Sequence, residues 1–170
     1  DASWSLRLAA GADLDSVDSL MVNTGSGDVT VGAGVMLRTG TGDIDVRAGR
    51  DLVLSDASSV IYTTGIDAGI GTLDPLAASL YVDGVYPVLG GTVDIVAGRN
   101  IEAAESDQLI SDWLWRFGGG VDANLGELPL TWNVSILNFR QGVAAFGGGD
   151  VHIAAAGDVR NLSAAVPTTR

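Results

Sequence analysis

The chain has 170 residues, which suits one domain with a buried core or one stretch of a repeat array. Its formal net charge of −12 comes from 21 acidic residues against 9 basic ones, all of them Arg, and this balance argues against binding to nucleic acid or anionic lipid. The lack of Cys excludes disulfides, thiol catalysis and cysteine-type zinc sites. Abundant Gly (24 residues) with few aromatics favours thin, stacked strands joined by tight turns.

A nine-residue pattern recurs along the chain: apolar, any, apolar, any, Ala, Gly, any, Asp or Asn, apolar. The alternating start predicts a strand with one buried face, and Ala-Gly predicts a tight corner. Asp or Asn after the corner can bond nearby backbone amides, and a second short strand follows. The copies span residues 6–14, 29–37, 44–52, 93–101 and 151–159, with Met36 and Ala156 as departures from the pattern. Glycine turns at 25–28, 40–43, 90–92 and 147–150 precede four of them.

One copy of the pattern cannot bury its own apolar face, so successive copies are expected to stack in register, about 4.8 Å apart. This predicts an all-β chain folded as a β-solenoid over residues 1–170, and we expect this solenoid to be one segment of a larger protein. The first three copies begin at residues 6, 29 and 44, so the coils are expected to be irregular in length. An antiparallel barrel or sandwich is the structural alternative, although Asn-Gly hairpin signals are missing.

Two insertions interrupt the pattern. Residues 55–89 are expected to form loops with one extra strand at 79–82. Residues 103–146 are expected to begin with a short amphipathic helix, which Ser106 or Asp107 would cap and 118–120 would end, and a strand follows in which Trp132, Val134 and Ile136 alternate. The helical spacing is that of Leu109, Ile110, Trp113, Leu114 and Phe117.

The second insertion carries the aromatic residues that suit a binding surface for a glycan or a protein: Trp113, Trp115, Phe117 and Trp132. Aromatic side chains anchor partners and stack on sugars. The alternative, which we favour, is that they pack the insertion onto the solenoid, because large aromatics are mostly buried.

No catalytic residue, metal site or cofactor is expected. Asp43 and Asp45 share one strand face, and Asp28 and Asp43 would pair if their coils stack, as the paired carboxylates of a polysaccharide-degrading enzyme require. Asp28 and Asp43 each end a glycine turn, however, and closing that turn explains them without catalysis. His152, the only histidine, is expected to point outward. Calcium between stacked acids at the corners is a minor alternative.

The tandem Gly-Asp-apolar-x-apolar-x-Ala-Gly-Arg-Asp-apolar units resemble the filamentous haemagglutinin family of large exoproteins. The closing segment is especially similar, with Asn-Phe-Arg-Gln-Gly-Val at 138–143, Gly-Gly-Gly-Asp-Val at 147–151 and Gly-Asp-Val-Arg-Asn-Leu-Ser at 157–163. The resemblance implies a right-handed parallel β-helix and no catalytic residues.

The same resemblance implies a shaft segment of a cell-adhesion protein or of a contact-dependent inhibition stem. Such a protein is exported from a Gram-negative bacterium by a partner outer-membrane transporter and acts at the cell surface or in the medium. The expected partners are that transporter, flanking coils of the same polypeptide and a host-cell glycan or protein, but no nucleic acid.

Overall fold

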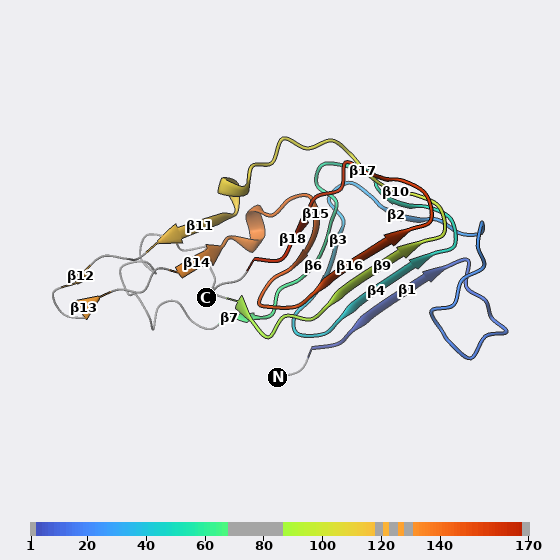
Figure 1. Cartoon of the computed structure of the whole chain (residues 1–170), viewed down its shortest axis with the longest axis horizontal. Helices are drawn as coiled ribbons and strands as arrows, with labels where there is room; N and C mark the ends of the chain where they lie inside the picture. Colours follow the sequence, from blue (N-terminus) through green and yellow to red (C-terminus); the bar gives the residue numbers. More distant parts are fainter. Residues whose placement is uncertain (1–2, 68–86, 118–120, 123–125, 128–130, 168–170) are drawn as a thin grey trace.

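The regular secondary structure of the described residues is almost entirely β-strand, as the computed structural model shows (Figure 1). Residues 3–67, 87–117, 121–122, 126–127 and 131–167 are described. Most strands belong to three sheets of four strands each, and every neighbouring pair within these sheets is parallel. Sheet 1 contains β1 (Leu6–Ala10), β4 (Ile44–Ala48), β9 (Val93–Ala97) and β16 (Val151–Ala155). Sheet 2 contains β2 (Val29–Val31), β5 (Leu52–Leu54), β10 (Ile101–Ala103) and β17 (Val159–Arg160). Sheet 3 contains β3 (Met36–Thr39), β6 (Val60–Thr63), β15 (Gly142–Ala145) and β18 (Ala164–Ala165).

The chain passes through sheets 1, 2 and 3 in the same order four times. We call these passes rounds 1 to 4: β1–β2–β3, β4–β5–β6, β9–β10–β15 and β16–β17–β18. Strands of consecutive rounds are neighbours in all three sheets, so each round lies edge to edge on the next. The prediction of an all-β chain that is stacked in register is therefore confirmed for the described residues.

The main core lies between the three sheets and is built from columns of apolar side chains. In β4 and β9 every second residue is fully buried, as the alternating pattern predicted. Ile44 pairs with Val93, and Leu52 pairs with Ile101, so each apolar residue rests on another of the next round. Rounds 2 and 3 supply most of this core because they are covered on both sides.

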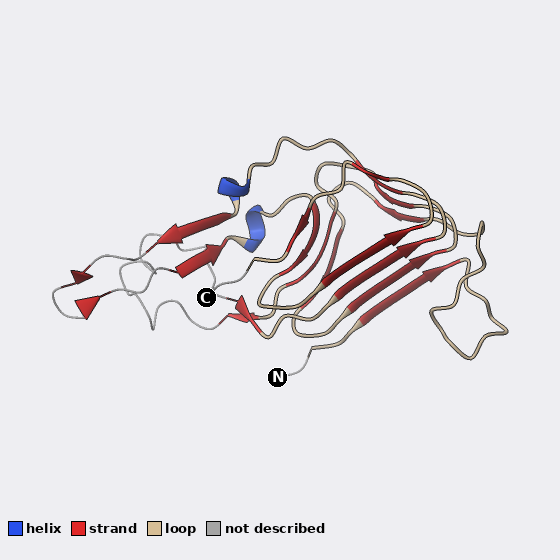
Figure 2. Cartoon of the chain, viewed as in Figure 1, coloured by secondary structure: helices blue, strands red, loops and turns tan. Residues whose placement is uncertain are grey.

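Three excursions leave the stack between its strands. Residues 11–28 form a loop between β1 and β2. The second begins and ends with the antiparallel pair β7 (Ile66–Asp67) and β8 (Pro87–Val88). The third, residues 104–141, contains the only two helical turns of the described chain, η1 (Ile110–Asp112) and η2 (Ile136–Asn138), shown in Figure 2. Its strands are β11 (Leu114–Phe117) paired with β14 (Thr131–Val134), and β12 (Val121–Asp122) paired with β13 (Gly126–Glu127).

The structure corrects the phase of the repeat. Residues 29–37 do not begin a round, because Val29 pairs with Leu52 in sheet 2 and not with Ile44 in sheet 1. The true rounds start at residues 6, 44, 93 and 151. Strands of sheets 1 and 2 alternate in the same way, so the pattern alone does not reveal to which of these sheets a strand belongs.

The two predicted insertions are also shorter than expected. Strand β6 lies inside 55–89 and β15 lies inside 103–146, and both pair on each side with strands of sheet 3. The Ala-Gly corner that follows β1, β4 and β9 does not follow β6 or β15, so the pattern missed them. The expected strand at 79–82 lies outside the described residues.

The predicted amphipathic helix is wrong. A three-residue helical turn, η1, is followed by β11, which pairs antiparallel with β14. The apolar spacing of Trp113 and Leu114 arises because both contact an aromatic cluster on sheet 3. The predicted strand around Trp132 is confirmed as β14, whereas Ile136 lies in η2.

Replacing Gly91 by Ala tests the close stacking of the rounds. A Cβ on Gly91 would overlap the carbonyl oxygen of Gly42 in the preceding round, so the backbone must shift. We expect a loss of about 1–3 kcal/mol in the free energy of unfolding, the usual cost of an overpacked site. Gly32→Ala is the matched control, since its Cβ would meet only the Val35 side chain at an ordinary 3.7 Å. Urea unfolding followed by circular dichroism measures both, and equal stability of the two variants would contradict the stacking geometry.

Candidate functional site

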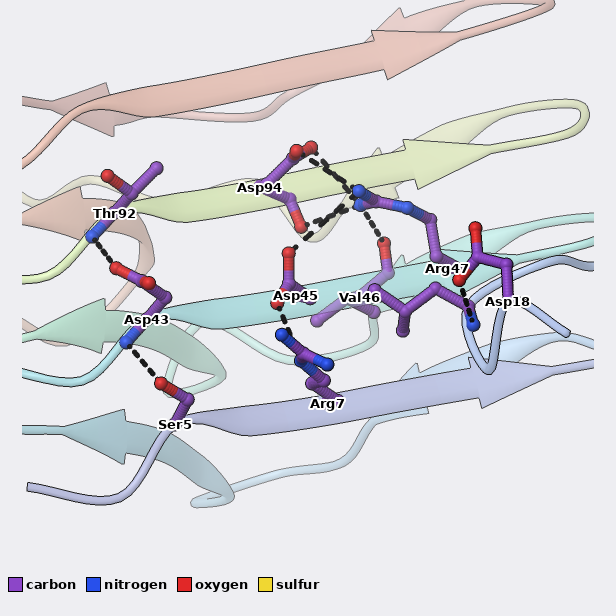
Figure 3. A network of polar contacts seen from close by, with 10 residues as sticks. Ser5, Arg7, Asp18, Asp43, Asp45, Val46, Arg47, Thr92 and Asp94 are labelled. Atoms are coloured by element: carbon purple, nitrogen blue, oxygen red, sulfur yellow. Dashed lines mark hydrogen bonds and ion pairs between the residues drawn. The ribbon is translucent and has the colours of Figure 1, made fainter.

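The outer face of sheet 1 carries a network of charged side chains (Figure 3). Asp45 and Asp94 are register partners on adjacent rounds, so their carboxylates would repel one another. Arg47 donates to both carboxylate oxygens of Asp94, at 3.1 and 3.0 Å, and lies 3.9 Å from Asp45. Arg7 of round 1 lies 3.4 Å from the other oxygen of Asp45. The two acids are therefore neutralised by arginines on both sides.

His152 continues the same column in round 4, because it pairs with Asp94. Its side chain is exposed on the outer face, as the sequence predicted. Among the described residues no group of three or more His, Asp or Glu side chains lies close enough to hold a metal ion.

A second feature lies at the corner between sheets 1 and 2, where each round places one Asp or Asn. We call Asp28, Asp51, Asn100 and Asp158 the corner ladder. Oδ1 of Asp28 accepts the backbone N–H of Asp51 at 3.1 Å, and Oδ1 of Asp51 accepts that of Asn100 at 3.1 Å. Oδ1 of Asn100 accepts the N–H of Asp158 at 3.0 Å. Each side chain thus binds the equivalent residue of the next round, which explains why Asp and Asn recur there.

Arginines reinforce the first two steps of the corner ladder. Arg50 donates from Nε to Asp28 at 2.7 Å and pairs with its other oxygen, and Arg99 does the same to Asp51 at 2.8 Å. The Arg50 hydrogen bond, helped by the N–H of Asp51, lowers the pKa of Asp28 from 3.8 to about 2. The Arg99 side chain likewise lowers the pKa of Asp51. These carboxylates are held ionised, which is unlike the raised pKa of a general acid.

A similar ladder lies at the corner between sheets 3 and 1. The backbone N–H of Asp43 donates to Ser5 Oγ at 3.1 Å, and Oδ1 of Asp43 accepts the N–H of Thr92 at 2.8 Å (Figure 3). Asp43 therefore closes a turn and joins two rounds. Asp28 belongs to the other corner, so Asp28 and Asp43 do not stack into the carboxylate pair that an enzyme would require.

The third excursion packs on the outer face of sheet 3 through an aromatic cluster. Trp113 is 5% exposed, and its ring centroid lies 5.2 Å from Phe139 and 5.8 Å from Phe146. Tyr62 of β6 lies 5.9 Å from Phe139, and all these pairs have edge-to-face geometry. Trp113 thus packs the excursion onto the stack, as our favoured alternative predicted.

The structure describes less of the other three predicted aromatic residues, Trp115, Phe117 and Trp132. Trp115 is half-buried on β11, opposite Asn133 of β14. The backbones of Phe117 and Trp132 lie in β11 and β14, and their side chains lie outside the described part of the structure. The sequence reading missed Tyr62, Phe139 and Phe146 as members of the cluster. The sequence feature that could have identified these residues is their size, because the repeat units contain only small and medium apolar residues.

Two hollows flank the excursion. A polar cavity of about 560 Å³ lies between the excursion and the corner that joins sheets 2 and 3, and its lining includes Asp56 of that corner with Asp107 and Arg140 of the excursion. An apolar groove of about 430 Å³ lies between the excursion and β18, where Ile110 and Leu114 face Val166. No helix of the described residues is long and apolar enough to cross a membrane.

The functional proposal rests on these structural features, because comparisons with known proteins give no match. No protein-family model matches the chain, and neither the curated proteins nor the solved structures searched include a match.

The pKa of Asp28 predicts how the corner ladder responds to acid. A lowered pKa stabilises the fold above pH 3.8, and this stabilisation disappears as the pH falls toward about 2. Asp28→Asn keeps an oxygen for the Asp51 N–H but loses the charge that binds Arg50. We expect the variant to unfold at lower urea concentration than the original chain at pH 6, and the gap to close between pH 4 and 2.

Asp15→Asn serves as the control because Asp15 is exposed in the loop of residues 11–28. Urea midpoints at successive pH values measure both variants against the original chain. A gap for Asp28→Asn that stays constant down to pH 2 would contradict the ion pair as its cause.

Proposed function

We propose that the chain is a segment of right-handed parallel β-helix that serves as a rigid shaft in a large secreted bacterial surface protein. The observation that carries this proposal is the fourfold passage through sheets 1, 2 and 3 in one order and register. A stack of this kind lengthens by adding rounds, each of which contacts only its neighbours. Its function is then geometric, since it holds another module at a distance from the cell.

The polar contacts support a structural role over a catalytic one. The acids that resembled a catalytic pair are each used within the stack: Asp43 joins two rounds, Asp45 pairs with arginines and Asp28 binds Arg50. A polysaccharide-degrading site needs carboxylates that are free to meet substrate. The proposal therefore includes no catalytic residue and no cofactor.

The resemblance to the filamentous haemagglutinin family supplies the rest of the proposal. On this resemblance we propose that the parent protein acts at the surface of a Gram-negative bacterium or in the medium, is exported through an outer-membrane transporter and serves adhesion or contact-dependent inhibition. Further rounds of the same polypeptide are the partners that fit the free edges of sheets 1 to 3, because unpaired strand edges readily pair with other strands.

The test is the size and location of the native polypeptide that contains this sequence. An antibody to the 170-residue chain is used to immunoblot cytoplasm, periplasm, outer membrane and medium. We expect a band far larger than 17.3 kDa at the outer membrane or in the medium. A cytoplasmic band near 17.3 kDa would overturn the shaft proposal.

A second candidate function is partner binding through the third excursion. The observation that favours it is a set of exposed large apolar side chains: Leu109 is 64% exposed, Ile110 67% and Leu137 70%. Exposed apolar residues gathered on one segment are typical of an interaction surface. The aromatic Trp113 would then support this surface from beneath and not contact the partner itself.

Replacing Leu109, Ile110 and Leu137 together by Ser tests this candidate. We expect binding of the purified chain to host cells to fall at least tenfold, with an unchanged circular dichroism spectrum because the three side chains are exposed. The control replaces by Ser two apolar residues of the loop of residues 11–28, Leu14 and Val17, which are more exposed still. Unchanged binding by the triple variant, or an equal loss in the control, would rule out the excursion as the contact surface.

A further inference from the structure

The exposed apolar residues of the third excursion stand on two helical turns that are fixed to one another. The backbone N–H of Ser135, just before η2, donates to the carbonyl oxygen of Trp113, just after η1, at 2.8 Å, so the two turns lie side by side (Figure 2). Within η1, Oδ2 of Asp112 accepts a backbone N–H at 2.9 Å and closes the turn. These turns therefore hold in one arrangement the surface that we call the apolar rim, which consists of Leu109, Ile110 and Leu137.

The polar cavity of about 560 Å³ lies beside both turns, because Asp112 of η1 and Asn138 of η2 line it together. Its other charged lining residues are Asp56, Asp107 and Arg140. Among the described residues, Arg140 forms no ion pair with any of these acids. The cavity therefore presents three carboxylates and one guanidinium that do not neutralise one another by direct contact.

These carboxylates differ from the acids of the corner ladder, where arginines pair with the carboxylates between rounds. The hydroxyl and the backbone N–H of Ser58 donate to Oδ1 of Asp56, at 2.5 and 2.9 Å, and lower the pKa of that carboxyl. Asp107 is exposed and accepts no hydrogen bond from another described residue. The negative charge of the cavity is therefore available to a ligand and is not used to hold the fold together.

The lining and the rim together restrict the chemistry of that ligand. The acids of the described chain are too far apart to form a group of three around a metal ion, whereas separate cationic side chains can each meet one carboxylate. A sugar ring is commonly bound by stacking on an aromatic side chain, and the described lining of the cavity contains none. A second copy of the chain, with its charge of −12, would be repelled. The ligand that fits carries basic groups for the cavity and aliphatic groups for the rim.

We propose that the polar cavity and the apolar rim bind a protein segment in which Lys or Arg side chains stand beside aliphatic ones. The cations meet the carboxylates of the cavity, and the aliphatic side chains cover the rim. Complementary charge selects the partner and speeds its association, and burial of the rim adds an attraction that salt does not screen. This inference rests on the candidate function of partner binding through the third excursion and gives that partner its chemical class.

The first test uses fluorescence anisotropy to measure binding of the purified chain to three labelled peptides of equal length. One alternates Lys with Leu, one alternates Glu with Leu, and one alternates Lys with Ser. The second peptide reports apolar contact without cations, and the third reports cations without apolar contact. We expect the Lys-Leu peptide to bind about tenfold more tightly than either of the others, because it alone matches both the cavity and the rim.

A pair of double variants locates the site. Asp107→Asn with Asp112→Asn removes two carboxylates from the cavity, and the second substitution keeps an oxygen to close η1. The matched control is Asp15→Asn with Asp18→Asn in the loop of residues 11–28, where both acids are exposed and Oδ1 of Asp18 likewise accepts a backbone N–H of its own loop, at 2.9 Å. One exposed charge pair changes affinity by about threefold, so we expect about a tenfold loss of Lys-Leu binding for the cavity variant and none for the control. Circular dichroism verifies that both variants keep the β-rich fold.

A gain of affinity tests the cavity from the other side. Arg140→Gln removes the one cation of the lining and is expected to strengthen Lys-Leu binding about threefold, whereas Arg7→Gln, which removes an exposed arginine from sheet 1, is expected to change nothing. Equal binding of the Lys-Leu and Glu-Leu peptides, equal losses in the two double variants, or no gain for Arg140→Gln would each overturn the basic partner. If the Ser variant of the rim nevertheless loses host-cell binding, partner binding through the excursion stands and only its chemistry is overturned. Cell fractionation tests the shaft function independently of both.

Discussion

Every strand of the three main sheets depends on the strand of the next round for its backbone hydrogen bonds. This lateral pairing fixes what each column of the stack can contain. Inward columns must be apolar, as Ile44, Val93 and their neighbours are, because they close the core between the sheets. Close contact between backbones requires glycine at places such as Gly91. A residue in the middle of the stack must therefore pack against its equivalents in both the preceding and the following round.

In-register stacking places like residues together, which is unfavourable for a chain with 21 acidic residues. The structure resolves this conflict in two ways. Arg47, Arg50 and Arg99 lie where acids of adjacent rounds would repel. Asp43 instead binds the backbone N–H of Thr92 in the following round. Charges that would oppose stacking thus become part of the contacts between rounds.

Sheet 3 differs from the other two because the third excursion covers its outer face. Strands β6 and β15 are buried on both faces, whereas β4 and β9 of sheet 1 alternate. The aromatic cluster around Trp113 and Phe139 forms a second, outer core on this face. The excursion is accordingly an integral layer of the fold, and the segment that carries its exposed apolar residues is packed on sheet 3 through this buried cluster.

The sequence determined the strands of sheet 1 and the corners that follow them. The repeat Ile-Asp-Val-Arg-Ala-Gly-Arg-Asp-Leu contains its own strand, bend and hydrogen-bonding side chain, so local chemistry is enough to read it. The same reading missed β6 and β15, because uninterrupted apolar strands look like neither a half-exposed strand nor a corner. It also took the spacing of Trp113 and Leu114 for a helix, where packing against sheet 3 selects a turn and a strand.

The tertiary structure alone decided which residues of different rounds meet. Nothing local distinguishes Val29 of sheet 2 from Ile44 of sheet 1, since both begin the same alternating pattern, and only their pairing partners separate them. The roles of Asp28 and Asp43 follow from the same pairing. Each depends on a backbone group that lies more than twenty residues away in the chain but one strand away in space, and a pattern within one segment holds no information about such contacts.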